Sequence, residues 1–286
     1  MKLVVRLALA VVLLAAVASA SRTVRDEFGR DMTVPDHPHR LICLAPSITD
    51  TVYALGAGAE IAGITDYTKY PPEAKQKPSV GGVINPSLET IAQLKPDLVL
   101  AIGGLNSLDL VKAIEHLGFT VFVIQPHGIA GIYNSIESIG RAINQSTKAS
   151  ELVIRLRERE RSVRERVAGK ARPTVFFLVW PDPITTAGRG AFVTELIEIA
   201  GGKSISDDLP YEWPQMSQEA VLARQPEYMV LARESNADLA QLRRQAWWKG
   251  LRAAQEGKVI YADDRIEYPS PIAFDALEDL ARRLHP

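Results

Sequence analysis

Short apolar runs alternate with amphipathic segments along the chain from Arg40 onward. In the first half the apolar runs are LICLAP, EIAGITDY, DLVLAI and FTVFVIQ, and helical patterns such as SLETIAQL and SLDLVKAIEHLG lie between them. Short strands that alternate with helix-length segments are typical of a layered α/β structure with mostly parallel strands. The pattern therefore predicts an α/β lobe over residues 40–145, preceded by an N-terminal extension at residues 21–39.

A second alternation of the same kind begins at TVFFLVW, residues 174–180. It continues through AFVTELIEIAGG and KVIYA and ends on the helical pattern IAFDALEDLARRL. We therefore predict a second α/β lobe over residues 171–286. With 286 residues, 47% of them hydrophobic, the chain is long enough to bury two moderate cores.

A long connecting helix is predicted between the lobes, in residues 146–170, with Ser146-Thr147 as its N-cap. Its apolar residues keep a helical period: Leu152, Leu156, Val163 and Val167. About 22 residues with a rise of about 1.5 Å each make a rod about 33 Å long, which is enough to brace two lobes. The segment is not rich in Gly and Ser, as a flexible linker would be. We therefore expect a stiff two-lobed body with limited closure.

The charge pattern argues against nucleic acid as a partner. Along the predicted long helix, arginines from Arg155 to Arg166 are interleaved with glutamates, which indicates a solvated face with ion pairs rather than a basic nucleic-acid face. Without residues 1–20, the chain keeps 31 of its 33 Lys and Arg against 34 Asp and Glu. This balance also gives no reason to expect an anionic membrane surface as a partner.

The first 20 residues fit a cleavable secretory signal peptide. Lys2 and Arg6 precede an uncharged apolar stretch, and Ala18-Ser19-Ala20 fits a cleavage site of small residues. The alternative is a transmembrane anchor, which needs about 20 apolar residues; the short apolar region and its small-residue end favour cleavage. The single cysteine, Cys43, lies in an apolar segment well past that site, so we expect a buried hydrophobe rather than a lipid-attachment site or half of an internal disulfide.

One phrase occurs twice in the chain, as SLETIAQLKPDLVLA from residue 87 and as SQEAVLARQPEYMVLA from residue 217. In each copy the serine can cap a helix, and the glutamate two residues later, Glu89 or Glu219, gains about 0.3–1 kcal/mol from the helix dipole. The proline then ends the helix. A capping-box glutamate would stand three residues after the serine. These two are therefore either simple dipole partners or one exposed carboxylate per lobe that docks arginines of a partner.

Sequence motifs for catalysis and metal binding are absent. The histidines form no H-E-x-x-H or comparable cluster, and the sequence contains no phosphate-binding loop and no G-x-S-x-G motif. We predict no catalytic residues, no metal site and no cofactor. Two alternatives stay open: a secreted α/β hydrolase, and a metal-binding protein in which His127, near a predicted strand end, is one ligand.

Four segments carry a resemblance to a known family: RLICLAPSITDTVYALG, GITDYTKYPPEA, SLETIAQLKPDLVLA and WPQMSQEAVLARQPE. In this order, from about Arg40 to the C-terminus, they resemble the periplasmic substrate-binding proteins that deliver vitamin B12, haem and iron-siderophores to ABC importers. The resemblance implies two Rossmann-like α/β lobes joined by a long connecting α-helix, with a ligand cleft between them. It also implies a periplasmic monomer whose Glu89 and Glu219 engage arginines on the importer's membrane subunits.

Ligand contacts follow from the similarity to the vitamin B12-binding members of the family. Tyr67 matches a tyrosine that contacts the corrinoid, Trp213 matches a tryptophan at the cleft, and Asp264 matches a polar contact from the second lobe. A corrinoid is a broad, mostly apolar disc rimmed by amides, so flat aromatic walls with a few polar contacts suit it. Trp180 and Tyr268 are further candidates for these walls.

Other positions depart from the vitamin B12 pattern. Val83 and Ile102 stand where that pattern has aromatic residues, and Tyr268 stands where it has an arginine. Arg189 lies between two glycines in WPDPITTAGRGAF, which we expect to be a loop; it could contact an anionic ligand such as a haem propionate, or lie solvated in a plain turn. We therefore predict a cobalamin-binding protein of an ABC importer, with a ferric-siderophore or haem-binding protein of the same kind as the alternative.

Overall fold

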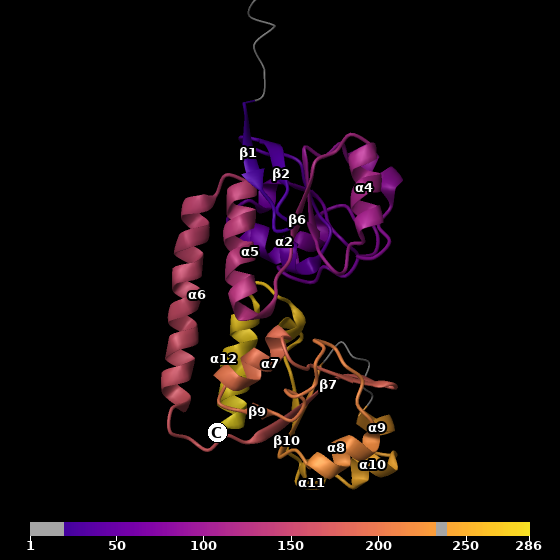
Figure 1. Ribbon diagram of the computed structural model, residues 1–286, viewed down its shortest axis with the longest axis vertical. Helices are drawn as coiled ribbons and strands as arrows, with labels where there is room; N and C mark the ends of the chain where they lie inside the picture. Colours follow the sequence, from indigo (N-terminus) through magenta and orange to yellow (C-terminus); the bar gives the residue numbers. More distant parts are fainter. Residues whose placement is uncertain (1–19, 233–238) are drawn as a thin grey trace, which may run out of the picture.

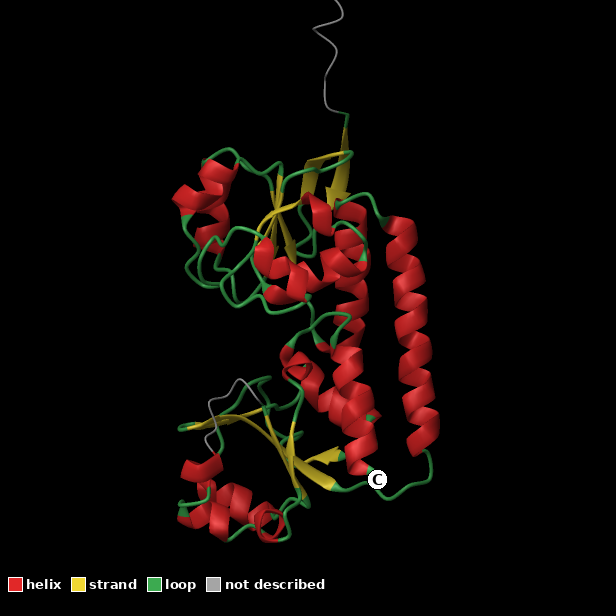
Figure 2. Ribbon diagram, turned by 180° about the vertical axis from the view of Figure 1, so that it is seen from behind, coloured by secondary structure: helices red, strands yellow, loops and turns green. Residues whose placement is uncertain are grey.

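The computed structural model describes residues 20–232 and 239–286. They form two α/β lobes, one above the other, with a long helix running along one side of both (Figures 1 and 2). The predicted signal peptide lies outside the described residues except for Ala20. Within the described ranges, no helix is both long enough and apolar enough to span a membrane. The two-lobed fold predicted from the sequence is confirmed.

The N-terminal lobe is built on a parallel sheet with the strand order β4-β3-β5-β6. Its strands are β3 (Leu41–Cys43), β4 (Ile61–Gly63), β5 (Leu98–Ile102) and β6 (Val121–Ile124). Every residue of β3, β5 and β6 is buried, as expected where helices cover both faces of a parallel sheet. The helical elements are α2 (Pro46–Ala54), η1 (Gly58–Glu60), η2 (Pro72–Gln76), α3 (Leu88–Leu94) and α4 (Leu108–His116).

The predicted N-terminal extension forms an antiparallel hairpin of β1 (Ser21–Arg25) and β2 (Asp31–Pro35). Its tip pairs with β6, since the Glu27 N–H donates to the Val123 carbonyl over 3.0 Å. At its other end Arg22 Nη2 donates to the carbonyls of Arg141 and Ala142, both at 2.8 Å. The extension is therefore a fixed part of the N-terminal lobe.

The C-terminal lobe has a mixed sheet in the order β11-β10-β7-β8, with β9 also paired to β7. The strands are β7 (Thr174–Pro181), β8 (Ile184–Thr186), β9 (Lys203–Ser204), β10 (Tyr228–Leu231) and β11 (Val259–Tyr261). The expected loop at residues 180–192 is wrong in part. Here β7 continues to Pro181, and the chain returns as β8, antiparallel to β7.

Seven helical elements of the C-terminal lobe lie within the described residues. They are α7 (Phe192–Ile199), α8 (Gln218–Arg224), α9 (Leu239–Leu242), α10 (Ala246–Lys249), α11 (Arg252–Gln255), η3 (Asp264–Glu267) and α12 (Ala273–Leu284). Helix α12 is the last long helix of the chain. Two of its acidic residues, Asp275 and Glu278, contact Arg159 of the connecting helix.

The connecting helix is α6 (Ser146–Val167), which has 22 residues and is therefore about 33 Å long. It is preceded by α5 (Gly128–Ala142), and the two helices lie side by side. The predicted N-cap is wrong, because Ser146 is already the first helical residue and Gln145 precedes it without a capping side chain. The predicted ion pairs within the helix are confirmed by Arg164–Glu160 at 2.7 Å and Arg161–Glu165 at 4.0 Å. In addition, Arg159 on α6 contacts Asp275 and Glu278 of α12 at 2.6 and 2.7 Å.

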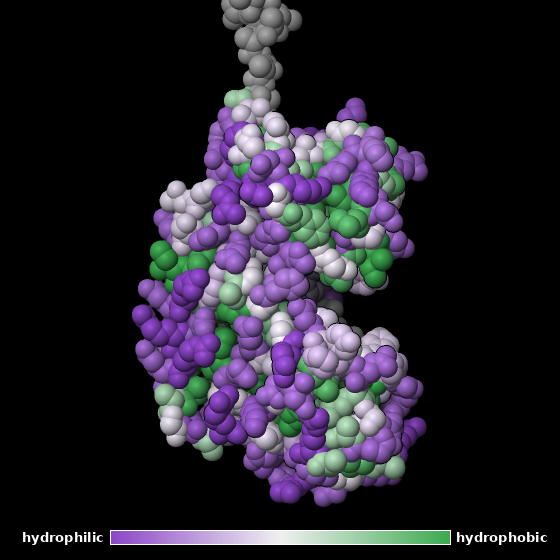
Figure 3. Space-filling view, viewed as in Figure 1, coloured by the Kyte–Doolittle hydropathy of each residue, from purple (hydrophilic) through white to green (hydrophobic). Residues whose placement is uncertain are grey.

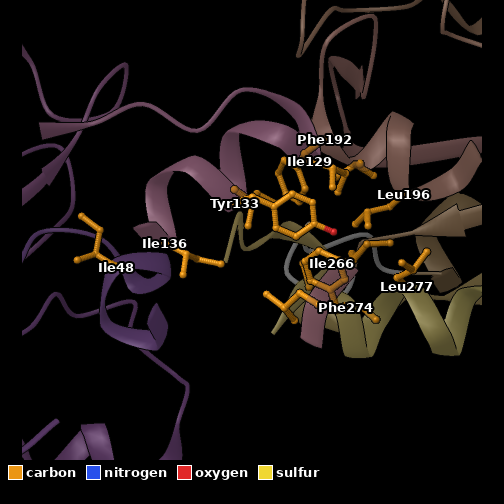
Figure 4. Close-up of a cluster of buried hydrophobic side chains, with 14 of the residues drawn as sticks. Ile48, Ile129, Tyr133, Ile136, Phe192, Leu196, Ile266, Phe274 and Leu277 are labelled. Carbon is orange, nitrogen blue, oxygen red and sulfur yellow. The ribbon is translucent and has the colours of Figure 1, made fainter. Parts of the chain in front are cut away.

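One hydrophobic core extends through both lobes. Side chains of α5, α7 and α12 meet around Tyr133, whose ring centroid lies 5.6 Å from that of Phe274 (Figure 4). The same cluster includes Phe122 of β6 in the N-terminal lobe and Phe177 of β7 in the C-terminal lobe. The lobes are therefore joined by a packed interface as well as by α6, and the limited closure expected from the sequence stays a prediction.

Candidate functional site

A cavity of about 460 Å³ lies between the two lobes. It belongs to the notch that separates the lobes on one side of the molecule (Figure 3). Its walls come from the carboxyl ends of β5, β6 and β7 and from loops of the C-terminal lobe. Carboxyl ends of parallel strands are the usual place of ligand sites in open α/β sheets. The lining residues are Ile102–Leu105, Gln125–His127, Val179, Phe192, Glu212, Trp213, Glu267 and Pro269.

The N-terminal wall is shaped by two glycines directly after β5. Gly104 has a φ of +85°, a conformation that glycine adopts without steric cost. A Cβ atom at Gly103 would lie 3.0 Å from the Phe28 ring, so the hairpin tip packs on this wall from behind. The buried Asn106 fixes the loop: its Oδ1 accepts from Ile102 N–H at 2.8 Å and its Nδ2 donates to the Val83 carbonyl at 2.7 Å.

The start of α5 is held by a carboxylate from the opposite lobe. Glu195 of α7 accepts the N–H of Ile129 over 2.8 Å, which satisfies one of the free N–H groups of that helix start. Gly128 has a φ of +61°, and a Cβ atom there would lie 2.3 Å from a Glu195 oxygen. This close approach fixes the position of His127, which immediately precedes α5 and lines the cavity.

The C-terminal wall carries Trp213 on a segment that pairs with the loop after β8. The Gly188 N–H donates to the Glu212 carbonyl over 2.9 Å. A Cβ atom at Gly188 would lie 2.2 Å from the Tyr211 carbonyl oxygen, so the two backbones can approach this closely only because residue 188 is glycine. Trp213 then packs edge-on against Phe192, with 6.4 Å between ring centroids.

Polar contacts connect the lobes at the cavity wall and beside it. His127 Nδ1 lies 2.8 Å from Glu212 Oε1, and both residues line the cavity. The Tyr70 hydroxyl donates to Asp264 Oδ1 over 2.7 Å. Desolvation, together with this bond to a carboxylate, raises the pKa of Tyr70 to about 12. The tyrosine therefore stays protonated and keeps donating over the physiological pH range.

A buried carboxylate also lies between the lobes. Asp50 of α2 accepts the Ile272 N–H, just before α12, over 3.1 Å. Burial raises the pKa of Asp50, while hydrogen bonds from Ser270 and from the Ile272 N–H act in the opposite direction. This contact belongs to the lobe interface rather than to the cavity wall.

The chain is similar to proteins of a known family. The model of a periplasmic binding protein family matches residues 41–266. The chain belongs to this family. A relative among these periplasmic binding proteins is an uncharacterised ABC transporter substrate-binding lipoprotein of Bacillus subtilis, 30% identical over 92% of this chain and 85% of its own length. Another, the vitamin B12-binding protein of Vibrio cholerae, is 28% identical over 87% of this chain and 90% of its own.

Solved structures of periplasmic binding proteins have the same fold. The crystal structure of the vitamin B12-binding protein of Vibrio cholerae has a TM-score of 0.75, with 28% identity over 86% of this chain and 96% of that chain. A haem-binding protein from Roseiflexus has a TM-score of 0.76 with 23% identity, covering 86% and 98% of the two chains; that likeness concerns the fold alone. The fold is therefore shared by members with different named ligands.

In this periplasmic binding protein the repeated phrase forms two matched helix starts. Ser87 accepts the Thr90 N–H at 3.1 Å and Ser217 accepts the Ala220 N–H at 3.2 Å, so both predicted caps are confirmed. Glu89 and Glu219 are exposed in the first turns of α3 and α8. Hydrogen bonds from its own N–H and from the serine of its cap lower the pKa of Glu219. The docking role of the two carboxylates stays a prediction.

Of the five predicted ligand residues, the structure places only Trp213 in the cavity wall. Tyr67 and Trp180 are exposed outside the lining, with exposed fractions of 62% and 43%. Asp264 is buried beneath Tyr70 and Lys69, and Tyr268 is buried edge-on against Tyr70, with 6.1 Å between ring centroids. These four lie outside the cavity wall, and their contact with ligand stays a prediction.

Two carboxylates of the cavity wall, Glu212 and Glu267, were not predicted from the sequence. Glu212 directly precedes Trp213, so the prediction of Trp213 as a ligand contact could have pointed to Glu212 as well. Glu267 follows the three polar or charged residues 263–265 at a turn, and no residue pattern marks it. Arg189, weighed as an anion contact, lies outside the cavity lining, and its Nε donates to the Asp207 carbonyl over 3.3 Å.

Proposed function

We propose that this protein is the periplasmic substrate-binding component of an ABC importer and that its ligand is a corrinoid, with cobalamin as the first candidate. The observation that carries the proposal is the cavity between the lobes, where Trp213, Phe192 and Ile102 present apolar surface to a shared space. Full-length similarity to a vitamin B12-binding protein, in sequence and in fold, supports the choice of ligand. The predicted signal peptide supports the periplasmic location.

Transport would follow from the arrangement of the two lobes. Ligand enters at the notch and contacts both walls, and the packed interface of α5, α7 and α12 limits how far the lobes can move. Glu89 and Glu219 then present one carboxylate from each lobe to arginines of the importer's membrane subunits. Release requires the importer to separate the two cavity walls, both of which the bound ligand contacts.

Calorimetric titration with cyanocobalamin tests the ligand. We expect micromolar or tighter binding by the wild type and at least a tenfold loss in Trp213→Ala, because an aromatic anchor in a cavity commonly contributes 2 kcal/mol or more, roughly. Tyr261→Ala is the matched control, since Tyr261 is an aromatic residue of similar exposure, 40% against 43% for Trp213, but does not line the cavity. Absence of cyanocobalamin binding would reject the proposed ligand.

One contact favours haem as a second candidate. His127 lines the cavity, and its Nδ1 lies against Glu212 Oε1, which leaves Nε2 as the ring nitrogen available to an iron. A carboxylate that holds the other ring nitrogen is the usual second partner of a metal-binding histidine. Titration with haem, followed by absorbance, should then give a spectrum that His127→Ala changes. An identical spectrum in the variant would exclude this ligation.

A further inference from the structure

Two adjacent glycines leave a stretch of bare main chain in the N-terminal wall of the cavity. Gly103 and Gly104 directly follow β5, and both line the cavity. Gly104 is exposed, and a Cβ atom at this position would have no atom of the described residues within 4 Å apart from its chain neighbours. A side chain at residue 104 would therefore extend into the open space of the cleft. Glycine is common where a ligand must approach the backbone closely.

This stretch of main chain is held in place from behind and at both ends. Behind it packs the ring of Phe28, which a Cβ atom at Gly103 would meet at 3.0 Å. The Gly103 N–H donates to the Ile124 carbonyl of β6 over 2.8 Å. The Asn106 N–H donates to the Ile102 carbonyl over 2.9 Å and closes the turn. A side chain introduced here would consequently take space from the cavity, because the loop cannot withdraw to make room for it.

The wall contributed by the C-terminal lobe is aromatic. Trp213 and Phe192 both line the cavity, and their rings pack edge to face with 6.4 Å between centroids. The notch in Figure 3 is thus bounded by aromatic rings on one lobe and, in part, by backbone without side chains on the other. A broad, flat ligand suits both surfaces, since it can stack on a ring and lie close to bare main chain.

We propose that Gly104 is a specificity-determining residue of the cleft. The ligand is a broad planar macrocycle that lies directly on the main chain of residues 103 and 104, and the missing side chain at residue 104 provides the width that the macrocycle needs. Corrinoids and haem share this chemistry. Any larger residue at this position narrows the cavity and overpacks the bound complex. This inference rests on the proposed function, in which the cavity is the ligand site.

The test uses two substitutions for which side-chain size and backbone strain have opposite orders. At the φ of +85° that Gly104 has, asparagine is less strained than alanine, although asparagine is larger. Cyanocobalamin binding is measured by calorimetry for the wild type and both variants. We expect binding to weaken about threefold in Gly104→Ala and at least tenfold, roughly, in Gly104→Asn, because the cost of overpacking grows with the added group. Backbone strain alone would give the reverse order.

Gly118 provides a matched control for the backbone. It has a φ of +88°, and a Cβ atom there would also have no atom of the described part of the chain within 4 Å beyond its neighbours. It lies outside the cavity wall, in the turn after α4. Gly118→Ala and Gly118→Asn should lower the midpoint of thermal unfolding about as much as the matching Gly104 variants, because the strain is similar. Their affinity for cyanocobalamin should stay within about twofold of the wild type.

The outcomes separate this inference from the proposed ligand. If the wild type binds cyanocobalamin, binding by Gly104→Asn that is no weaker than binding by Gly104→Ala would overturn the role of Gly104. Losses of the same size in the Gly118 variants would do so too. If the wild type binds haem instead, the same variants are titrated with haem, followed by absorbance, and the same order is expected. Binding of neither macrocycle by the wild type would reject the proposed ligands and this inference with them.

Discussion

Substitution of Phe122 by alanine in the N-terminal lobe should destabilise both lobes together. Phe122 is fully buried on β6 and belongs to the core that continues through α5 into α7 and α12. Removing a fully buried phenylalanine ring costs about 3–5 kcal/mol. For a chain of this size 1 kcal/mol shifts the midpoint of thermal unfolding by about 2 °C, so Phe122→Ala should lower it by about 6–10 °C.

Tryptophan fluorescence is the decisive assay for this prediction, because every tryptophan of the chain is in the C-terminal lobe: Trp180, Trp213, Trp247 and Trp248. If the lobes share one core, the tryptophan signal of Phe122→Ala should move down by the same amount as the far-UV circular dichroism. Ile84→Ala, at an N-terminal-lobe position that is 73% exposed, should change stability by less than about 0.5 kcal/mol. An unchanged tryptophan midpoint beside an earlier loss of dichroism would show that the lobes unfold separately.

Three further predictions concern the wall, the lobe interface and the helix starts. Gly188→Ala should weaken ligand binding at least tenfold, roughly, because its Cβ would meet the Tyr211 carbonyl oxygen and displace the tryptophan-bearing segment; unchanged calorimetry would contradict this. Burial raises the pKa of Asp50 above its ordinary value of 3.8. The free energy of unfolding of the wild type therefore falls as the pH rises from 3.8 to the pKa that Asp50 has in the folded state. In denaturant titrations, the free energy of unfolding of Asp50→Asn should rise relative to that of the wild type at about pH 7 but not at about pH 3. An equal difference between the two proteins at both pH values would refute the assignment. The pair Glu89→Ala and Glu219→Ala should retain ligand affinity and lose uptake, and normal uptake in cells would rule out docking through them.

Periodicity predicted the framework of this protein because both sheets are mostly parallel and buried. Runs such as DLVLAI and TVFFLVW have apolar residues on both strand faces, and they became β5 and β7. The helix caps at Ser87 and Ser217 could also be predicted from the sequence, because a cap is a local interaction. By contrast, β8 is three residues long and exists only because β7 is beside it, so no local pattern marks it.

Most of the cavity wall could not be predicted from the sequence, because it also depends on contacts between segments that are distant in the chain. The places of Glu212 and Trp213 depend on a close approach of two loops at Gly188, and Gly103 lines the wall because β5 ends there. Tyr70 and Asp264 are 194 residues apart and meet only across the lobe interface. Such contacts arise from tertiary packing, which a single sequence does not specify residue by residue.

The N-terminal hairpin matters for how the protein can be shortened. A truncated chain that begins at Arg40 would retain every strand of both main sheets. It would nevertheless lose the ring of Phe28 behind Gly103 and the arginine that holds the end of α5. Such a chain should fold but bind its ligand poorly, because the N-terminal hairpin supports the cavity wall from behind.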